Sequence, residues 1–238
     1  MSDAKCSECG GSGWQVVVQG DYSYVRPCSC TVSLRENRVE SGLPERYYLC
    51  TFENFQVSPS GGKKNPTLMA ARTVVRDFAG KFPALNTGLL ISGPAGTGKT
   101  HLAAAALNTL INRNEHGILF RDFRELLQDI RSSYSSDSKV NEFGILAPVL
   151  NARLLIIDDL GAERPTEWAD SQFSYILNYR YNRLLPVIIT TNYLDGGGRM
   201  EEESLSERVG ARMRSRLFEM CREVRIEAED YRKINIGQ

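Results

Sequence analysis

The stretch that decides the fold of this 238-residue chain reads Leu89-Leu90-Ile91-Ser92-Gly93-Pro94-Ala95-Gly96-Thr97-Gly98-Lys99-Thr100. A short apolar strand leads into the pattern G-x-x-x-x-G-K-[ST], and residues 99–112 continue with a helical pattern. Strand, glycine-rich turn and helix together are the context in which this pattern marks a phosphate-binding loop. Chance produces the pattern in roughly one chain per hundred of this length, and the correct flanks make chance rarer still.

The residue types in this loop match the chemistry of phosphate binding. Glycines let backbone N–H groups turn inward around phosphate oxygens, and the helix N-terminus adds its partial positive charge. We expect Lys99 to span the β and γ phosphates of a nucleotide and Thr100 to hold Mg²⁺. The predicted nucleotide-binding set from this region is Gly93, Pro94, Ala95, Gly96, Thr97, Gly98, Lys99, Thr100 and the adjoining His101, which has no evident chemistry of its own.

Two carboxylates follow a second apolar strand, Leu154 to Ile157. Ligands of open α/β sheets bind at the carboxyl ends of the strands, which is where Asp158 and Asp159 would lie. We expect Asp158 to hold Mg²⁺ and Asp159 to polarise an attacking water. A strand that merely ends in an acidic turn is the alternative, and the phosphate loop makes it less favoured.

A third strand, Val187 to Thr190, leads to Asn192. On a neighbouring strand Asn192 would lie near the γ-phosphate and could orient the water. Asparagine after a strand is equally often a turn residue.

Apolar strand-like and helix-like segments alternate from Asn65 onward, which predicts an α/β fold with a parallel sheet and crossover helices. The expected strands are 89–92, 118–120, 154–157, 187–190 and 223–226. The expected helices include one with the buried face Leu68, Ala71, Val75, Phe78 and Phe82, one marked by Phe123, Leu126, Leu127 and Ile130, and one carrying Trp168, Phe173, Ile176 and Leu177.

Arginines recur every four residues near the C-terminus, at Arg208, Arg212 and Arg216. Each precedes a residue of the apolar series Leu205, Val209, Met213 and Leu217. One helix from Ser204 to Met220 would bury the apolar series and hold the arginines at its rim, where a long side chain can reach a second subunit. A solvated basic face, paired with Glu201 to Glu203, Glu207 and Glu219, is the alternative.

Four of the six cysteines form two close pairs, Cys6 with Cys9 and Cys28 with Cys30, separated by eighteen residues. Four thiolates at this spacing can close tetrahedrally on Zn²⁺, and residues 1–35 hold too few aliphatic side chains for a core without such a crosslink. A structural zinc is favoured over a redox pair or disulfides. The other two, Cys50 and Cys221, are expected to be small core residues.

Composition excludes several classes of protein. The 29 Lys plus Arg balance the 29 Asp plus Glu, so a global basic field for nonspecific DNA binding is excluded and any nucleic-acid contact is a local patch. Hydrophobic residues make up 42% of the chain, but no apolar run approaches the length of a membrane span. The first residues, Met1 to Lys5, lack a secretory signal pattern, which favours a cytoplasmic protein.

In this order and spacing, the motifs resemble AAA+ ATPases of the DnaC/DnaI helicase-loader group, whose relatives include the IstB transposition helpers. The resemblance covers nearly the whole chain. It identifies Gly93 to Thr100 as Walker A, Leu154 to Asp159 as Walker B and Thr190 to Asn192 as sensor 1. It further identifies Ser215-Arg216-Leu217 as the arginine-finger region, with Arg212 and Arg208 as alternatives, and Asp230-Tyr231-Arg232 as sensor 2, with Arg232 near the nucleotide of its own subunit.

The resemblance implies an AAA+ core with a five-stranded parallel sheet, which binds ATP and Mg²⁺, beside an N-terminal segment that binds Zn²⁺. It also implies loading of a hexameric DnaB-type replicative helicase onto single-stranded DNA, helicase docking by the N-terminal segment and assembly through the arginine finger. The expected parts are a zinc-binding module at 1–35, a connector and linker at 36–64 and the ATPase domain at 65–238. The charged stretch 35–48 of the connector is expected to be helical.

Two features depart from the commoner pattern of such ATPases. Only six residues follow Arg232, which predicts no full lid domain. Asp159 stands where glutamate is commoner, and its shorter reach leads to the hypothesis of slow hydrolysis that suits a switch better than a motor.

Other interpretations remain open. Arg124, Arg131, Tyr134 and Lys139 could form a groove for single-stranded DNA, or an ordinary exposed helix. The chain could instead be a transposition helper of the IstB type, a P-loop kinase for a small molecule, or a zinc-bearing scaffold that binds ATP without cleaving it.

Overall fold

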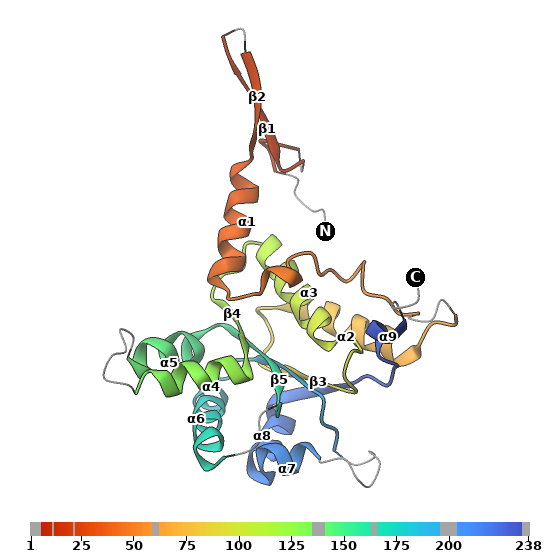
Figure 1. Cartoon of the computed structure of the whole chain (residues 1–238), viewed down its shortest axis with the longest axis vertical. Helices are drawn as coiled ribbons and strands as arrows, with labels where there is room; N and C mark the ends of the chain where they lie inside the picture. Colours follow the sequence, from red (N-terminus) through yellow and green to blue (C-terminus); the bar gives the residue numbers. More distant parts are fainter. Residues whose placement is uncertain are drawn as a thin grey trace.

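The computed structural model describes residues 6–10, 12–20, 22–58, 62–134, 141–162, 166–195 and 204–234. A helix and a two-stranded hairpin project from a layered body, and both are plain in Figure 1. Part of the expected linker, residues 59–61, lies outside the described residues, as does Lys139.

The body is built on five parallel strands, as the sequence predicts. They are β3 (Gly88–Ser92), β4 (Ile118–Asp122), β5 (Leu154–Leu160), β6 (Val187–Thr191) and β7 (Cys221–Arg225), in the order β4-β5-β6-β3-β7. The central strands β3 and β6 are buried along their whole length, as expected for a parallel sheet covered on both faces. The strand that leads into the phosphate loop thus lies inside the sheet.

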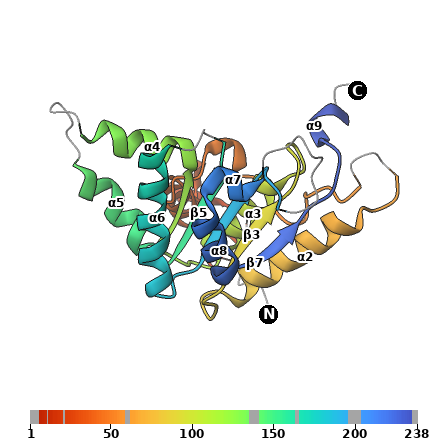
Figure 2. The same cartoon turned by 90° about the horizontal axis from the view of Figure 1, so that it is seen from below.

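Helices cover both faces of this sheet (Figure 2). Side chains alternate between the faces, so that Ile156 packs with α2 and α3 whereas Leu155 and Ile157 pack with the other helices. The helices of the body are α2 (Pro66–Lys81), α3 (Lys99–Asn112), α4 (Phe123–Ser132), α5 (Glu142–Asn151), α6 (Glu167–Asn182), α7 (Leu205–Val209), α8 (Ala211–Met220) and α9 (Tyr231–Ile234). The α/β class and the flanked parallel sheet are confirmed.

Both ends of α2 are capped by side chains. Asn65 accepts hydrogen bonds from the backbone N–H groups of Thr67 and Leu68, and proline follows at the first helical position. The helix ends at Lys81, so that Phe82, expected on its face, is the buried residue just after it.

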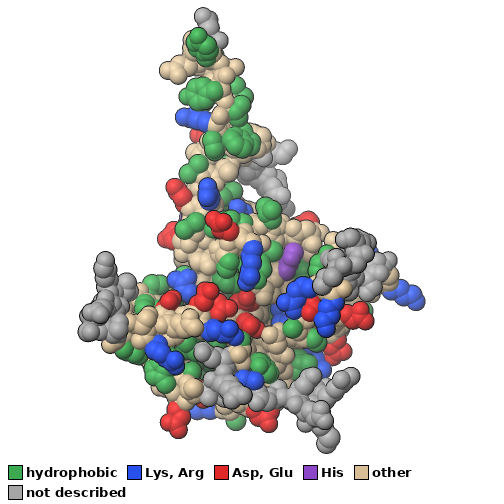
Figure 3. Space-filling view, viewed as in Figure 1, with side chains coloured by type: hydrophobic (Ala, Val, Ile, Leu, Met, Phe, Trp, Pro, Cys, Tyr) green, Lys and Arg blue, Asp and Glu red, His purple; other side chains and the backbone are tan. Residues whose placement is uncertain are grey.

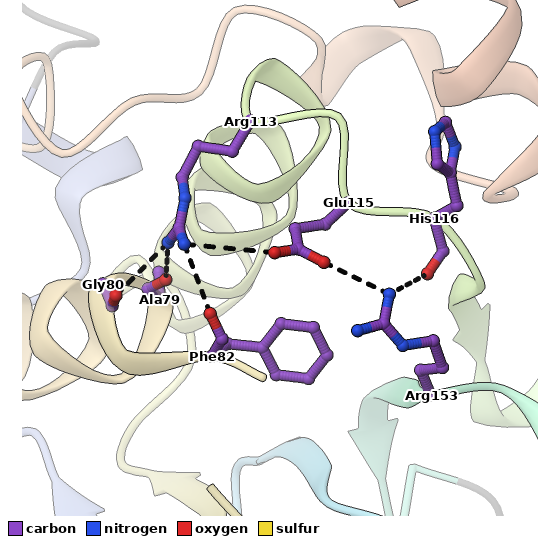
Figure 4. Close-up of polar contacts among 7 residues, drawn as sticks. All are labelled: Ala79, Gly80, Phe82, Arg113, Glu115, His116 and Arg153. Atoms are coloured by element: carbon purple, nitrogen blue, oxygen red, sulfur yellow. Dashed lines mark hydrogen bonds and ion pairs between the residues drawn. The ribbon is translucent and has the colours of Figure 1, made fainter. Parts of the chain in front are cut away.

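At the other end of α2, Arg113 of the turn after α3 supplies the missing donors. Its guanidinium donates to the carbonyl oxygens of Ala79, Gly80 and Phe82 (Figure 4). Glu115 lies between Arg113 and Arg153, with N···O distances of 4.0 and 3.2 Å. This network ties α2, α3 and the start of β5 together at the amino end of the sheet, away from the phosphate loop.

The N-terminal part differs from the expected helical connector at 35–48. Strands β1 (Trp14–Gln19) and β2 (Tyr22–Pro27) pair antiparallel, and α1 (Ser29–Glu40) follows directly. Residues 35–40 are helical within α1, as predicted, but a left-handed turn at Gly42 ends this stretch, and beyond it only a short 3-10 turn, η1 (Glu45–Tyr47), is helical. The helix therefore begins and ends earlier than predicted.

Gly42 is required where the chain passes the edge of the sheet. The backbone N–H of Phe120 in β4 donates to the carbonyl of Ser41 at 2.7 Å. A Cβ on Gly42 would lie 2.8 Å from the Phe120 carbonyl oxygen, so that a larger residue would push the connector off the edge strand. This contact holds the root of α1 against the body.

The prediction of one helix from Ser204 to Met220 is wrong. Helices α7 and α8 are separated at Gly210, whose φ of 78° and ψ of 145° are not helical. The apolar series is nevertheless buried throughout, namely at Leu205, Val209, Met213 and Leu217. The four-residue repeat therefore predicts the buried positions correctly on both sides of the interruption of the helix at Gly210.

Within the described residues, no helix is both long enough and apolar enough to cross a bilayer.

Candidate functional site

A cleft of about 600 Å³ opens at the carboxyl ends of the strands, next to the phosphate loop. It is lined by Arg46, Tyr47, Asn54, Phe55, Gln56, Leu68, Ala95, Gly96, Thr97, Gly98, Lys99, Thr100, His101, Asp122, Asp158, Asp159, Thr190, Asn192, Ala228, Glu229, Tyr231 and Arg232. The predicted motifs therefore meet in one place. Its volume suits a nucleotide, since ligand pockets usually span about 300–1,000 Å³.

Two glycines of the loop permit close approaches. A Cβ on Gly98 would lie 2.7 Å from the ring of Phe55, and Gly98 has a left-handed φ of 90° just before α3. A Cβ on Gly96 would collide with the carboxylate of Asp230. Glycine therefore lets the residues around positions 55 and 230 close against the loop.

Lys99 is buried at the start of α3, and its ammonium points back into the loop. Its Nζ donates to the carbonyl oxygens of Gly93 at 2.9 Å and Pro94 at 2.7 Å. Burial lowers the pKa of Lys99 to about 8, while the carboxylates of Asp159 and Asp158 act in the opposite direction. A bound anion would again favour the charged form of Lys99, because its attraction for the ammonium would offset the cost of burying that charge.

Asp158 accepts two hydroxyl hydrogen bonds from different elements. Thr100 Oγ1 of α3 and Thr190 Oγ1 of β6 both donate to Asp158 Oδ1, at 2.9 and 2.5 Å. Burial raises the pKa of Asp158, and the two hydroxyls oppose that rise. Thr100 and Asp158 are hard oxygen donors side by side, which fits the ligand preference of Mg²⁺.

Asp159 lies in the left-handed region with φ of 58°, at a point where the pairing of β5 with β6 shifts register. Its backbone N–H donates to Thr190 Oγ1 at 2.9 Å, and its side chain accepts from Asn192 Nδ2 at 2.7 Å. This backbone turn directs the two adjacent carboxylates to different partners, Asp158 to hydroxyls and Asp159 to the amide at the end of β6.

The segment around Arg232 closes the cleft from the C-terminal side. The backbone N–H of Tyr231 donates to the carbonyl of Gly96 at 3.0 Å. Arg232 forms two hydrogen bonds of 3.0 Å with the carboxylate of Asp230, which hold the pKa of that carboxyl below its usual range. The guanidinium thus lines the cleft while it is bound to an acid of its own segment.

His101 lines the cleft, but its ring is turned toward the connector. Its Nε2 lies 3.0 Å from the carbonyl oxygen of Thr51, and its ring packs against Phe55 at 5.4 Å between centroids. These contacts give His101 a structural partner on the stretch before α2.

The motif search missed several lining residues. They are Arg46, Tyr47, Asn54, Phe55, Gln56, Leu68, Asp122, Ala228 and Glu229. Only Asp122 carried a local signal, as a carboxylate at the end of a strand opposite Asp158. The others come from the connector, from α2 and from the stretch after β7.

The three candidate interface arginines have different surroundings, and none lines the cleft of its own chain. Arg208 lies 4.7 Å over the ring of Tyr193, and Arg216 lies 4.5 Å over the ring of Tyr181. Arg212 is exposed at the start of α8, and no partner for it is found in the described part of the chain.

The four N-terminal cysteines converge as predicted. The sulfur of Cys6 lies 3.8 Å from that of Cys28, Cys9 and Cys30 are 3.6 Å apart, and all four sulfurs lie within 4.8 Å of one another. A tetrahedron with Zn–S bonds of about 2.3 Å has S···S edges of about 3.8 Å. The structure has no disulfide among these four cysteines, so the donor set and its spacing fit zinc.

A carboxylate also approaches this cluster. Glu8 Oε2 lies 3.7 Å from Cys28 Sγ and accepts hydrogen bonds from Gln15 and Ser29. With two partners of its own, Glu8 links the cysteine loop to β1 and α1.

Two of the four residues considered for DNA binding, Arg131 and Tyr134, form contacts within the body. Arg131 lies 4.8 Å over the ring of Trp168, and Tyr134 meets the same ring edge-on at 6.4 Å. The Tyr134 hydroxyl donates to Glu142. Arg131 and Tyr134 thus hold α4, α5 and α6 together, and the proposed groove gains no support from their positions.

Comparison with known proteins gives a consistent result. Residues 67–237 match the family described as IstB-like ATP binding protein. The replicative helicase loader DnaC of Buchnera aphidicola subsp. Baizongia pistaciae is 31% identical over 140 residues, which are 59% of this chain and 54% of that protein. The corresponding protein of Escherichia coli K12 is 30% identical over 190 residues, 76% of this chain and 72% of that one.

A crystal structure of the DnaC helicase loader has the same fold. It superposes with a TM-score of 0.64 and 32% sequence identity, and the match covers 77% of this chain and all of that chain. The matched part of this chain spans about half the length of the Buchnera relative and about three quarters of the Escherichia coli relative.

Proposed function

Because the chain belongs to the IstB-like ATP-binding proteins, a family of AAA+ P-loop ATPases, we propose that it is an ATP-dependent loader of a hexameric DnaB-type replicative helicase onto single-stranded DNA. The observation that carries the nucleotide part is the meeting of Lys99, Thr100, Asp158 and Asn192 in one cleft. The loading part rests on the likeness to DnaC proteins.

Different residues of the cleft have different roles in ATP hydrolysis. The loop from Gly93 to Thr100 holds the phosphates, and Lys99 exchanges its carbonyl partners for phosphate oxygens. Thr100 and Asp158 hold the Mg²⁺ that accompanies ATP, which neutralises phosphate charge. Asp159, fixed by Asn192, orients and polarises the attacking water.

A second subunit completes the cleft with an arginine, which stabilises charge in the transition state. Arg216 belongs to the region that the family resemblance indicates. Its stack on Tyr181 would have to open, however, and Arg208 is stacked on Tyr193 in the same way. Arg212 is exposed, and within the described residues its side chain has no contact that would have to open, so we place it first among the three.

The N-terminal hairpin is the docking element for the helicase. One face of it carries Trp14, Val16, Val18 and Val25, which are 56, 70, 73 and 60% exposed. Hydrophobic side chains gather on this projection in Figure 3. Exposed contiguous apolar surface of this kind marks sites of protein interaction. Zinc, held by Cys6, Cys9, Cys28 and Cys30, stabilises the hairpin.

We retain the three-part organisation with a zinc module at 1–35, a connector at 36–64 and the ATPase at 65–238. Helix α1 crosses the first boundary, so the module and the connector share one rigid element.

The decisive test is capture of the host's replicative helicase by the tagged full-length protein. We expect retention by the wild type, and loss with Cys6→Ser plus Cys9→Ser and with Val16→Ser plus Val18→Ser. The second pair leaves the cysteines intact and therefore separates docking from folding. Equal retention of all three proteins would exclude the hairpin as the docking element.

The family match also includes transposition helpers as an alternative function. Stimulation of a cognate transposase, without helicase capture, would favour that function. ATP binding without phosphate release, with or without single-stranded DNA, would favour the scaffold.

A further inference from the structure

The connector that leads from α1 to the body contributes two side chains to the nucleotide cleft. Arg46 and Tyr47, both in η1, line it together with the phosphate loop. The Arg46 guanidinium lies 4.7 Å over the ring of Tyr47 and is exposed. No carboxylate pairs with Arg46 in the part of the chain that the structure describes.

The P-loop helix fixes this part of the connector. Asn108 of α3 is buried, and its Nδ2 donates to the carbonyl oxygens of Tyr47 and Cys50, each at 2.9 Å. Seven residues earlier in α3, His101 contacts the carbonyl of Thr51. The backbone that carries Arg46 therefore has a defined position relative to the helix that begins with Lys99.

Arg46 and Tyr47 line the same cleft as Lys99, Thr100 and Asp158. Tyr47 packs near Phe120 of β4, the strand that ends at Asp122. Burial is the main cause of the raised pKa of Tyr47, and the negative charge of Asp158 adds to it.

The acidic side chains of this region favour an additional positive charge. Asp122, Asp158 and Asp159 all line the cleft, whereas Arg232 is already bound to Asp230. An exposed guanidinium without an acidic partner binds phosphate oxygens strongly, because the hydrogen bonds are charge-assisted and can be bidentate.

We propose that Arg46, supported on the ring of Tyr47, is a phosphate-binding residue of this nucleotide site and contacts the terminal phosphate of ATP. The inference rests on the proposed nucleotide site. It assigns to the connector a direct contact with the one phosphate that distinguishes ATP from ADP. The segment that joins the body to α1 thereby distinguishes the ATP-bound from the ADP-bound state.

The test is the ratio of ATP to ADP affinity, measured by calorimetry with Mg²⁺ on the full-length protein. We expect Arg46→Ala to weaken ATP binding by roughly tenfold and ADP binding by less than about threefold, the range of one lost charge-assisted contact. Arg46→Lys keeps a charge without the planar fork and should lie between Arg46→Ala and the wild type.

Arg35→Ala is the matched control, since Arg35 is exposed on α1 and absent from the cleft lining. It should leave both affinities unchanged. An unchanged ATP to ADP ratio in Arg46→Ala, with equal losses or with none, would overturn the assignment. Failure of the wild type to bind either nucleotide would instead overturn the nucleotide site itself, and Lys99→Ala serves as the reference for that outcome.

Discussion

Arg38 of α1 donates a hydrogen bond from Nε to Oδ1 of Asn108, at 3.1 Å, and this bond joins the helix that carries Cys30 to the P-loop helix. Asn108 uses its amide nitrogen for Tyr47 and Cys50 at the same time. Each hydrogen-bonding atom of this buried side chain thus has a partner, and the partners lie on two segments of the N-terminal part.

We predict that Asn108→Ala separates these segments from the body. It leaves the Tyr47 and Cys50 carbonyls without their donor, which costs about 2 kcal/mol or more. For a chain of this size the expected loss in melting temperature is about 4–8 °C. Hydrogen exchange should accelerate at residues 45–50. Asn112→Ala, on an exposed position of the same helix, should change neither quantity. Equal effects of both variants would show that the hydrogen bonds of Asn108 do not hold these segments to the body.

The lowered pKa of Lys99 leads us to predict that ATP binding depends on pH. Its pKa of about 8 means that the free protein loses the ammonium proton as pH rises through 8, whereas bound phosphates favour the charged form. ATP affinity should therefore be full below pH 8 and fall above it, by up to about tenfold per pH unit. Binding near pH 9 should take up close to one proton, measurable as a buffer-dependent binding enthalpy.

The control is Lys99→Arg, because a guanidinium does not titrate in this range. Any ATP binding that remains in this variant should show no proton uptake near pH 9. Buffer-independent enthalpy in the wild type would contradict the lowered pKa.

The same lowered pKa predicts the stability of the nucleotide-free protein. Between pH 8 and the ordinary lysine pKa of 10.5, the unfolded chain holds a proton that the folded chain has lost. Stability arising from Lys99 should therefore increase with pH across this window. Urea unfolding of wild type and Lys99→Met at pH 7.5 and 9.5 measures this term, since the difference between the two proteins should shift in favour of the wild type at the higher pH.

Metal removal should affect the N-terminal part alone. A two-stranded hairpin with an exposed apolar face is barely stable without a crosslink. We expect one zinc per chain in the wild type, loss of hairpin signals on chelation, and unchanged ATP affinity in the body. Cys28→Ser should lose zinc, whereas Cys50→Ser, outside the cluster, should retain it. Purified protein that contains much less than one zinc per chain would contradict the site.

The sequence was sufficient for the parts of the fold whose signals are local. Strands β3, β4, β5 and β6 each contain a short apolar run, and the phosphate loop has its pattern within eight residues. The two carboxylates of β5 could be placed because strand ends meet at one edge of a parallel sheet.

The remaining site residues could not be found in this way. Arg46 and Phe55 reach the cleft through contacts with residues more than forty positions away, and no periodicity predicts such contacts. The break at Gly210 was missed because the apolar repeat continues across it. The stacks of Arg208 and Arg216 depend on rings of other elements, so spacing alone could not rank the arginines.

Asp159, in place of the commoner glutamate, gives the last prediction. Aspartate tolerates the left-handed φ of 58° better than longer side chains do, and it is held by Asn192 at 2.7 Å. Asp159→Glu extends the carboxylate past this amide toward the water position, so turnover should rise while stability falls by about 1 kcal/mol. Asp159→Asn should keep ATP binding but lose about 100-fold or more in hydrolysis, because the base is removed. Phosphate release at saturating ATP measures all three proteins, and an Asp159→Glu variant with unchanged turnover would show that the short side chain does not limit the rate.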